Sequence, residues 1–114
     1  MNKLLSVDDL INVVKQYNPG TKADLIKKAY DFGLAAHAGQ MRKSGEPFFS
    51  HPVQVANILA ELKLDDASII TALLHDTIED TTRSFRDVAG LFGAEIANLV
   101  DGVTKLSNLE VASL

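Results

Sequence analysis

The chain has 114 residues, of which 46% are hydrophobic, and a formal net charge of -4 at pH 7. This length suits one domain, and the apolar content excludes an extensively disordered chain. The acidic balance argues against nucleic-acid binding, which usually needs a basic surface. The absence of cysteine excludes disulfides and thiolate zinc sites. No apolar run approaches the ~20 residues that a membrane span needs, so we expect a cytoplasmic protein without a membrane partner.

Hydrophobic residues recur at helical spacing through the first forty positions, which predicts two helices. Ser6 is placed to cap the first helix, and the turn signal at 18–20 ends it. The second helix is expected to begin with Thr21 as its cap and to stop near Gly39. Its expected apolar stripe consists of Leu25, Ala29, Phe32 and Ala36.

A loop is expected over residues 39–50, where glycine and proline interrupt the helical pattern. The next helix is expected to begin at His51-Pro52, because proline is favoured at the first helical position. Its expected buried face consists of Val55, Ile58, Leu59 and Leu62.

A central helix is expected to start at a cap formed by Asp65 or Asp66 and to end at Thr81. It is apolar on more than one side, which predicts a place in the middle of a helical bundle. A short helix closed by Gly93 and a last helix through Val103 follow. Since no alternation typical of strands occurs, we predict an all-α bundle of about six helices.

The end of the central helix holds one histidine and three carboxylates within six residues: His75, Asp76, Glu79 and Asp80. Residues four apart share a helix face, so Asp76 lies over Asp80, and these like charges destabilise the helix unless a cation compensates. Asp76 also follows two leucines, and burying an unpaired carboxylate is costly. These features predict that His75 and Asp76 bind a metal ion.

The other candidate residues each have a structural alternative. His51 is either a further metal ligand or a histidine that only helps start its helix. His37, in the last turn of its helix, is interpreted as structural or solvent-facing. Glu79 and Asp80 either transfer protons during catalysis or form a solvated acidic helix end, a placement that opposes the helix dipole.

Arg42 and Lys43 are either ordinary surface charges or ligands for phosphate. Mixed imidazole and carboxylate ligation suits manganese, iron or zinc better than calcium. A metal with an open position lowers the pKa of its bound water and so generates a nucleophile. Together these features predict metal-assisted hydrolysis of a phosphoester or pyrophosphate.

Four segments occur in order along the chain: Arg42-Lys-Ser-Gly-Glu-Pro, His51-Pro-Val-Gln-Val-Ala, Leu74-His-Asp-Thr-Ile-Glu-Asp-Thr and Val100-Asp-Gly-Val-Thr-Lys-Leu. Together they resemble the hydrolase domain of the RelA/SpoT stringent-response family, a branch of the HD phosphohydrolase superfamily. The resemblance implies an all-helical fold and a manganese-dependent removal of pyrophosphate from the 3′ position of (p)ppGpp, yielding GDP or GTP. The implied partner is therefore a small guanosine nucleotide.

The resemblance also implies roles for individual residues. His51, His75 and Asp76 match three metal ligands of the family. Glu79 and Asp80 match the acid pair that marks its hydrolytically active members, and this pair would act on the attacking water and the leaving group.

The loop residues Arg42, Lys43 and Ser44 match the family's loop that contacts the nucleotide. The family has a further Asp ligand downstream, in a segment reading like Leu-Ala-Asp-Arg-Leu-His-Asn, and this sequence stops before such a segment. We therefore expect residues 1–114 to form a partial HD hydrolase domain without the fourth protein ligand.

Within this partial domain, residues 1–20 are assigned to an N-terminal helix and residues 21–109 to the core motifs. A partial bundle leaves apolar surface bare, and such patches tend to be covered by association, so we expect a homo-oligomer. Two alternatives stay open. One is a catalytically incomplete fragment that binds a nucleotide or a partner, and the other is an HD phosphohydrolase acting on another nucleotide.

Overall fold

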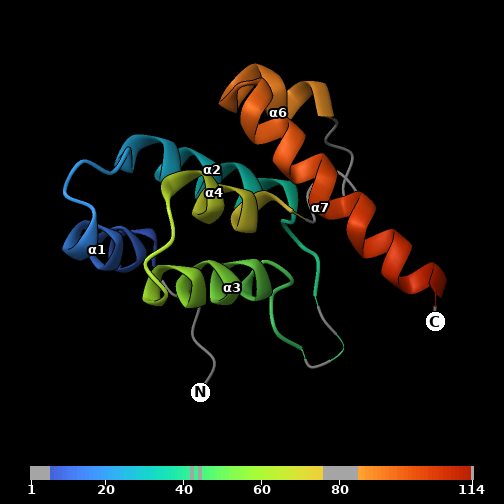
Figure 1. Ribbon diagram of the computed structural model, residues 1–114. Coiled ribbons are helices and arrows are strands. Elements are labelled where there is room, and N and C mark those ends of the chain that lie inside the picture. The colour runs from blue at the N-terminus through green and yellow to red at the C-terminus, as the bar shows by residue number, and fades with distance from the viewer. Residues whose placement is uncertain (1–5, 42, 44, 76–84, 114) are drawn as a thin grey trace.

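The computed structural model describes residues 6–41, 43, 45–75 and 85–113 (Figure 1). These residues form six α-helices and no strand, which confirms the all-α prediction. No helix among them has the length and apolar character that crossing a membrane requires. The helices are α1 (Val7–Tyr17), α2 (Ala23–Ala36), α3 (Ser50–Glu61), α4 (Asp66–Leu74), α6 (Phe85–Phe92) and α7 (Ala94–Ser113).

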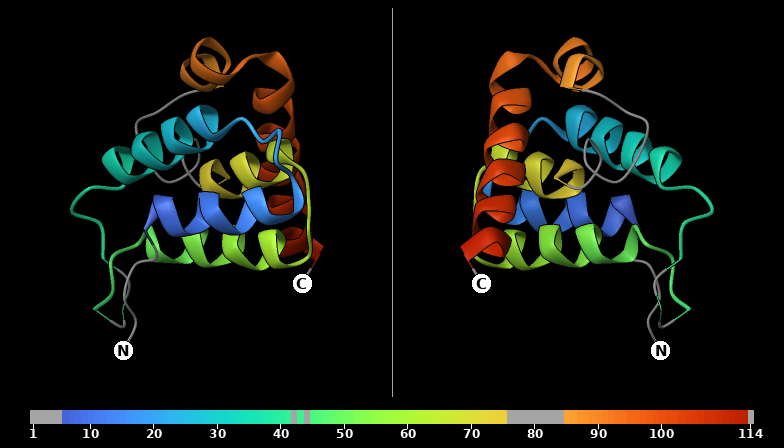
Figure 2. Two further views of the ribbon diagram at one scale, coloured as in Figure 1. Left: turned by 90° about the vertical axis from the view of Figure 1, so that its left-hand side faces the viewer. Right: turned by 90° about the vertical axis from the view of Figure 1, so that its right-hand side faces the viewer.

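Helix α4 lies in the middle of the bundle and packs against α2, α3 and α7 (Figure 1). Figure 2 shows α1 and α3 running side by side, while α7 stands along one side of the molecule. The four large apolar residues of α4 are between 0% and 2% exposed, which confirms its predicted central place. They are Ile69, Ile70, Leu73 and Leu74.

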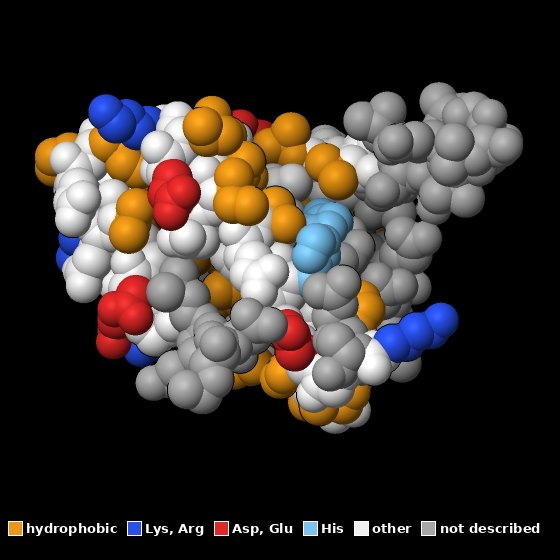
Figure 3. Space-filling model, turned by 90° about the horizontal axis from the view of Figure 1, so that it is seen from below, with side chains coloured by type: hydrophobic (Ala, Val, Ile, Leu, Met, Phe, Trp, Pro, Cys, Tyr) orange, Lys and Arg blue, Asp and Glu red, His pale blue; other side chains and the backbone are white. Residues whose placement is uncertain are grey.

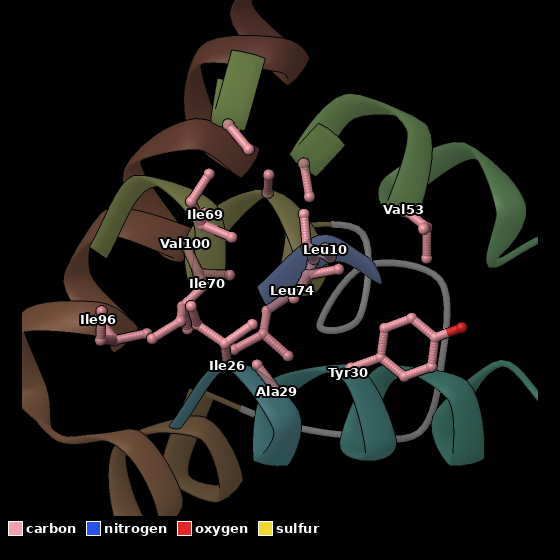
Figure 4. Packing of buried hydrophobic residues seen from close by; sticks show 14 of the residues in the cluster. Leu10, Ile26, Ala29, Tyr30, Val53, Ile69, Ile70, Leu74, Ile96 and Val100 are labelled. Carbon is pink, nitrogen blue, oxygen red and sulfur yellow. The ribbon is translucent and has the colours of Figure 1, made fainter. Parts of the chain in front are cut away.

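One hydrophobic cluster joins all six helices (Figure 4). Each fully buried large apolar side chain in such a cluster stabilises the fold by roughly 1.5–3 kcal/mol relative to its exposed state. Each helix contributes at least one buried member, for example Leu10, Ile26, Val53, Ile70, Val88 and Val100.

Two of the predicted helix caps are present. The side chain of Ser6 accepts a hydrogen bond from the Asp9 amide at 3.1 Å, and that of Asp65 accepts one from the Ser68 amide at 2.9 Å. Each cap satisfies an amide that has no partner inside its helix. Asp65 rather than Asp66 is therefore the cap of α4.

The prediction that Thr21 caps α2 is wrong. Helix α2 begins at Ala23, and its cap position is Lys22, whose side chain makes no capping hydrogen bond. The Thr21 hydroxyl instead donates to the Asp66 carboxylate, which also accepts a hydrogen bond from the Lys22 amide at 2.9 Å. Asp66 thus ties the start of α4 to the start of α2.

Helix α3 differs from the prediction in its start and in its buried face. It begins at Ser50, so Pro52 is its third residue, where the missing amide hydrogen is still harmless. Ile58 and Leu62 are 54% and 66% exposed, so their predicted burial is wrong. The buried face is instead built on smaller residues, which allow close helix packing: Pro52, Val53, Ala56 and Ala60.

The buried stripe of α2 is also shifted from the predicted one. Of the predicted stripe only Ala29 is fully buried, and the others are half-buried. Phe32 packs edge-to-face on Phe92 of α6, with ring centroids 5.8 Å apart. Helix α7 extends to Ser113, which is ten residues beyond Val103, the last apolar residue that the sequence pattern assigned to it. The buried residues of α2 are Ile26, Ala29, Tyr30 and Gly33.

Candidate metal centre

The fold brings together two of the predicted metal ligands, His51 and His75. His51 is the second residue of α3, and His75 directly follows the last residue of α4. Their ring centroids lie 6.3 Å apart, with the ring planes at 62°. His51 is exposed and His75 is half-buried. The packing of α3 on α4 therefore places two imidazoles from distant sequence positions side by side.

The ring of His75 is oriented by its own helix. Its Nδ1 lies 2.8 Å from the carbonyl oxygen of Ala72. A carbonyl oxygen only accepts, so Nδ1 donates, and in the neutral ring the lone pair then lies on Nε2. Metal-binding histidines are commonly oriented in this way, with one ring nitrogen donating to a carbonyl or carboxylate. The geometry of His75 thus fits a metal ligand.

Five predicted site residues fall outside the residues that the structure describes: Arg42, Ser44, Asp76, Glu79 and Asp80. Their roles as nucleotide contacts, metal ligand and acid pair stay predictions. Within the described part of the chain, no group of three or more histidine and carboxylate side chains could hold a metal ion.

The third predicted nucleotide contact, Lys43, is exposed on the loop between α2 and α3. The loop is closed at its base, where the Phe48 amide donates to the Gln40 carbonyl at 2.9 Å and an isolated β-bridge joins Met41 to Pro47. Gly45 has a φ of 88°, a conformation that glycine adopts without strain. The loop leads directly into α3, so Lys43 and His51 belong to one continuous stretch of chain.

His37 is buried rather than solvent-facing, so of its two predicted roles the structural one holds. It is 2% exposed and occupies the C-terminal cap position of α2. Its Nδ1 lies 2.7 Å from Oε1 of Gln40, and its ring stacks on Phe48 with centroids 4.9 Å apart.

An apolar groove of about 500 Å³ lies between α3, α4 and α7, and His75 forms part of its wall. Sequence reasoning did not find this groove. Its signal is a stripe of small and polar residues along α4 at positions 68, 71, 72 and 75, which share one helix face. On the face of the molecule seen in Figure 3, histidine atoms lie beside exposed hydrophobic side chains. The groove is lined by Val55, Leu59, Leu64, Ser68, Thr71, Ala72, His75, Leu99 and Val103.

Comparisons with known proteins show the family to which this region is similar. The family model described as "HD domain" matches residues 29–113. A GTP pyrophosphokinase of Myxococcus xanthus is 57% identical over 100 residues, which cover 88% of this chain and 13% of the relative.

Two further relatives are similar over nearly the same region. The GTP pyrophosphokinase rsh of Brucella ovis is 48% identical over 105 residues, covering 92% of this chain and 14% of the relative. The bifunctional (p)ppGpp synthase/hydrolase SpoT of Escherichia coli is 46% identical over 103 residues, covering 90% of this chain and 15% of the relative. The chain thus spans only a small part of the length of the relatives that it matches.

Proposed function

This chain belongs to the HD domain family and is homologous over most of its length to RelA/SpoT proteins, and from that premise we propose that it removes pyrophosphate from the 3′ position of (p)ppGpp. In this hydrolysis, water attacks phosphorus and the bond to the 3′ oxygen breaks, which yields GDP or GTP and pyrophosphate. The observation that carries the proposal is the His51–His75 pair, with the His75 ring oriented by the Ala72 carbonyl.

We propose that His51, His75 and Asp76 hold one Mn²⁺ ion. Two imidazoles and a carboxylate suit manganese, although iron or zinc would accept the same ligands. A divalent ion bound there supplies Lewis-acid chemistry to the phosphate group. The orienting bond of His75 lowers the cost of ordering its ring when the ion binds.

The remaining steps fall to side chains of the loop and of the acid pair. Glu79 and Asp80 would move protons at the attacking water and at the leaving 3′ oxygen. The cations Arg42 and Lys43, with the Ser44 hydroxyl, would bind the nucleotide phosphates by charge-assisted hydrogen bonds.

The names of the relatives cover both synthesis and hydrolysis. Two are called GTP pyrophosphokinases, while the Escherichia coli relative is called a synthase/hydrolase. The adjacent His75-Asp76 pair and the Glu79-Asp80 pair support the hydrolase function for this region, because metal-assisted hydrolysis needs metal ligands and groups that transfer protons to and from water.

The experiment that tests the proposal is an assay of ppGpp hydrolysis by this chain with added Mn²⁺, with bound metal measured on the same sample. We expect GDP and pyrophosphate to form in equal amounts. The Glu79→Ala variant should keep its metal and its nucleotide affinity and lose turnover by about 10²–10⁴-fold, the usual effect of removing a general acid or base.

Two further variants complete this experiment. Asp76→Ala should lose bound metal, because it removes a charged ligand. Glu61→Ala, which removes an exposed acid at the end of α3, is the matched control and should hydrolyse ppGpp like the unaltered chain. A chain that binds Mn²⁺ and ppGpp without hydrolysing it would contradict the proposal and favour a role in nucleotide binding alone.

Self-association stays a prediction, as does the cytoplasm as the compartment. The association prediction rests on the apolar groove and on the exposed side chains of Ile58 and Leu62, which are close in sequence to the groove residues Leu59 and Leu64. We expect sedimentation velocity at tens of micromolar to show species larger than a monomer. A single monomeric species would contradict it.

A further inference from the structure

His37 contacts both ends of the loop that carries Lys43. On the incoming side, its Nδ1 lies 2.7 Å from the side-chain oxygen of Gln40, and its carbonyl accepts the Gln40 amide at 3.0 Å. On the outgoing side, its ring stacks on Phe48 at 4.9 Å and 21°. Since the Phe48 amide also donates to the Gln40 carbonyl, these three residues form one closed set of contacts.

The same ring reaches the start of α3 through Phe49. The rings of His37 and Phe49 are nearly parallel, with centroids 6.1 Å apart, and Phe49 is 1% exposed. Phe49 also meets Tyr30 edge-to-face at 5.4 Å. A Cβ atom at Gly33 would lie 2.4 Å from Phe49 Cε1, so only glycine at that position leaves room for the ring. Phe49 stands two residues before His51, and its fixed ring therefore fixes the approach of the chain to the candidate metal ligand.

We propose that His37 is a positioning residue that holds the base of the loop, at Gln40 and Phe48, and the start of α3 in the arrangement that binds substrate and metal. The identity of the substrate in this inference rests on the proposed function, whereas the contacts of His37 do not depend on it. The side-chain oxygen of Gln40 only accepts, so the ring is in the form that carries hydrogen on Nδ1. Among the described residues, Nε2 of this buried ring has no hydrogen-bond partner.

The hydrogen bond between the His37 ring and the Gln40 side chain can be tested by substitution at either partner. The variant His37→Phe keeps a planar ring for stacking and removes only the bond to Gln40, and Gln40→Leu removes the same bond from the other side. Tyr17→Phe is the matched control, because it deletes a 2.6 Å side-chain hydrogen bond to the Leu64 carbonyl at the opposite end of the α1–α3 pair.

The first measurement is hydrogen exchange of the Phe48 amide by NMR, which needs neither metal nor substrate. We expect exchange to rise about fivefold in His37→Phe and in Gln40→Leu, the effect of losing one ordinary hydrogen bond, and to stay unchanged in Tyr17→Phe. In the double variant the rise should be no larger than in either single one. Unchanged exchange in both loop variants would overturn the proposal.

The second measurement separates positioning from general stability. In the active chain with Mn²⁺, both loop variants should raise KM for ppGpp several-fold with kcat changed less than twofold, while Tyr17→Phe leaves both constants unchanged. Faster exchange with an unchanged KM would also overturn the positioning role. If the unaltered chain shows no turnover, the proposed function fails, and Mn²⁺ affinity measured by calorimetry takes the place of KM. It should then fall in the two loop variants and not in the control.

Discussion

The two faces of α4 carry different kinds of residue and have different surroundings. One face consists of large apolar side chains that are completely enclosed by neighbouring helices. The other consists of Ser68, Thr71, Ala72 and His75, and it lines the open groove toward α3 and α7. A helix that is apolar on every side is usually just buried in the core. Large apolar residues and the candidate metal ligand His75 therefore lie on separate faces of α4, which predicts separable effects of substitution.

The largest effect on stability is expected on the enclosed face. Leu73 is completely buried, and replacing it with alanine removes apolar contacts and leaves a cavity in the core. We expect Leu73→Ala to lower the free energy of unfolding by about 2–5 kcal/mol. Urea denaturation measures this loss, with Leu62→Ala as the matched control at a leucine that is 66% exposed. A similar loss in both variants would show that burial on this face does not determine stability.

The enclosed face could be predicted from the sequence, because four large apolar residues in two adjacent pairs on a helix indicate burial in the core. The neighbouring helices were harder. On α3, the pattern of large residues predicted burial of Ile58 and Leu62, whereas the structure buries Ala56 and Ala60 instead. Hydrophobic periodicity alone cannot rank a small residue in a tight helix contact above a large residue nearby.

A smaller effect is expected where α4 begins. Asp65 caps the helix, and its hydrogen bonds from Ser68 hold the pKa of its carboxyl below the usual value. We expect Asp65→Ala to lower the free energy of unfolding by about 1 kcal/mol at pH 7. Because the folded pKa is the lower one, the charged carboxylate stabilises the fold above the unfolded pKa of about 3.9. That contribution is lost as pH falls through the folded pKa.

The variant Asp65→Asn separates the cap from the charge. Asparagine keeps a capping oxygen but does not titrate. The free energies of unfolding of the variant and of the unaltered chain should therefore converge as the pH is lowered. Urea midpoints measured between pH 7 and pH 2.5 report this convergence. A constant difference over that range would mean that the Asp65 carboxylate has no lowered pKa in the folded chain.

The candidate metal centre could be predicted only in part. The sequence indicated that His51 and His75 act together, and the structure brings their rings side by side. It did not indicate what holds them. The hydrogen bond to the Ala72 carbonyl depends on how the His75 side chain is turned at the end of its own helix, and the space at Gly33 and the stacking of His37 depend on contacts between α2 and the segment that leads into α3. A motif indicates the candidate site residues, whereas the residues that hold them in position belong to no recognisable motif.

The smallest effect, and one of opposite sign, is expected at Thr71 on the groove face. Its hydroxyl is buried and has no hydrogen-bond partner among the described residues, so it contributes desolvation cost without a compensating bond. We expect Thr71→Val, which keeps the shape of the side chain, to leave the free energy of unfolding unchanged or raise it by up to about 1 kcal/mol.

Thr21→Val is the matched control for this prediction. Because the Thr21 hydroxyl donates to Asp66, this variant should destabilise the fold. If Thr71→Val destabilised the chain as much as Thr21→Val, the Thr71 hydroxyl would have a partner in solution, such as a water molecule in the groove. The groove face of α4 would then contribute to stability through polar contacts, and the separation between its two faces would fail.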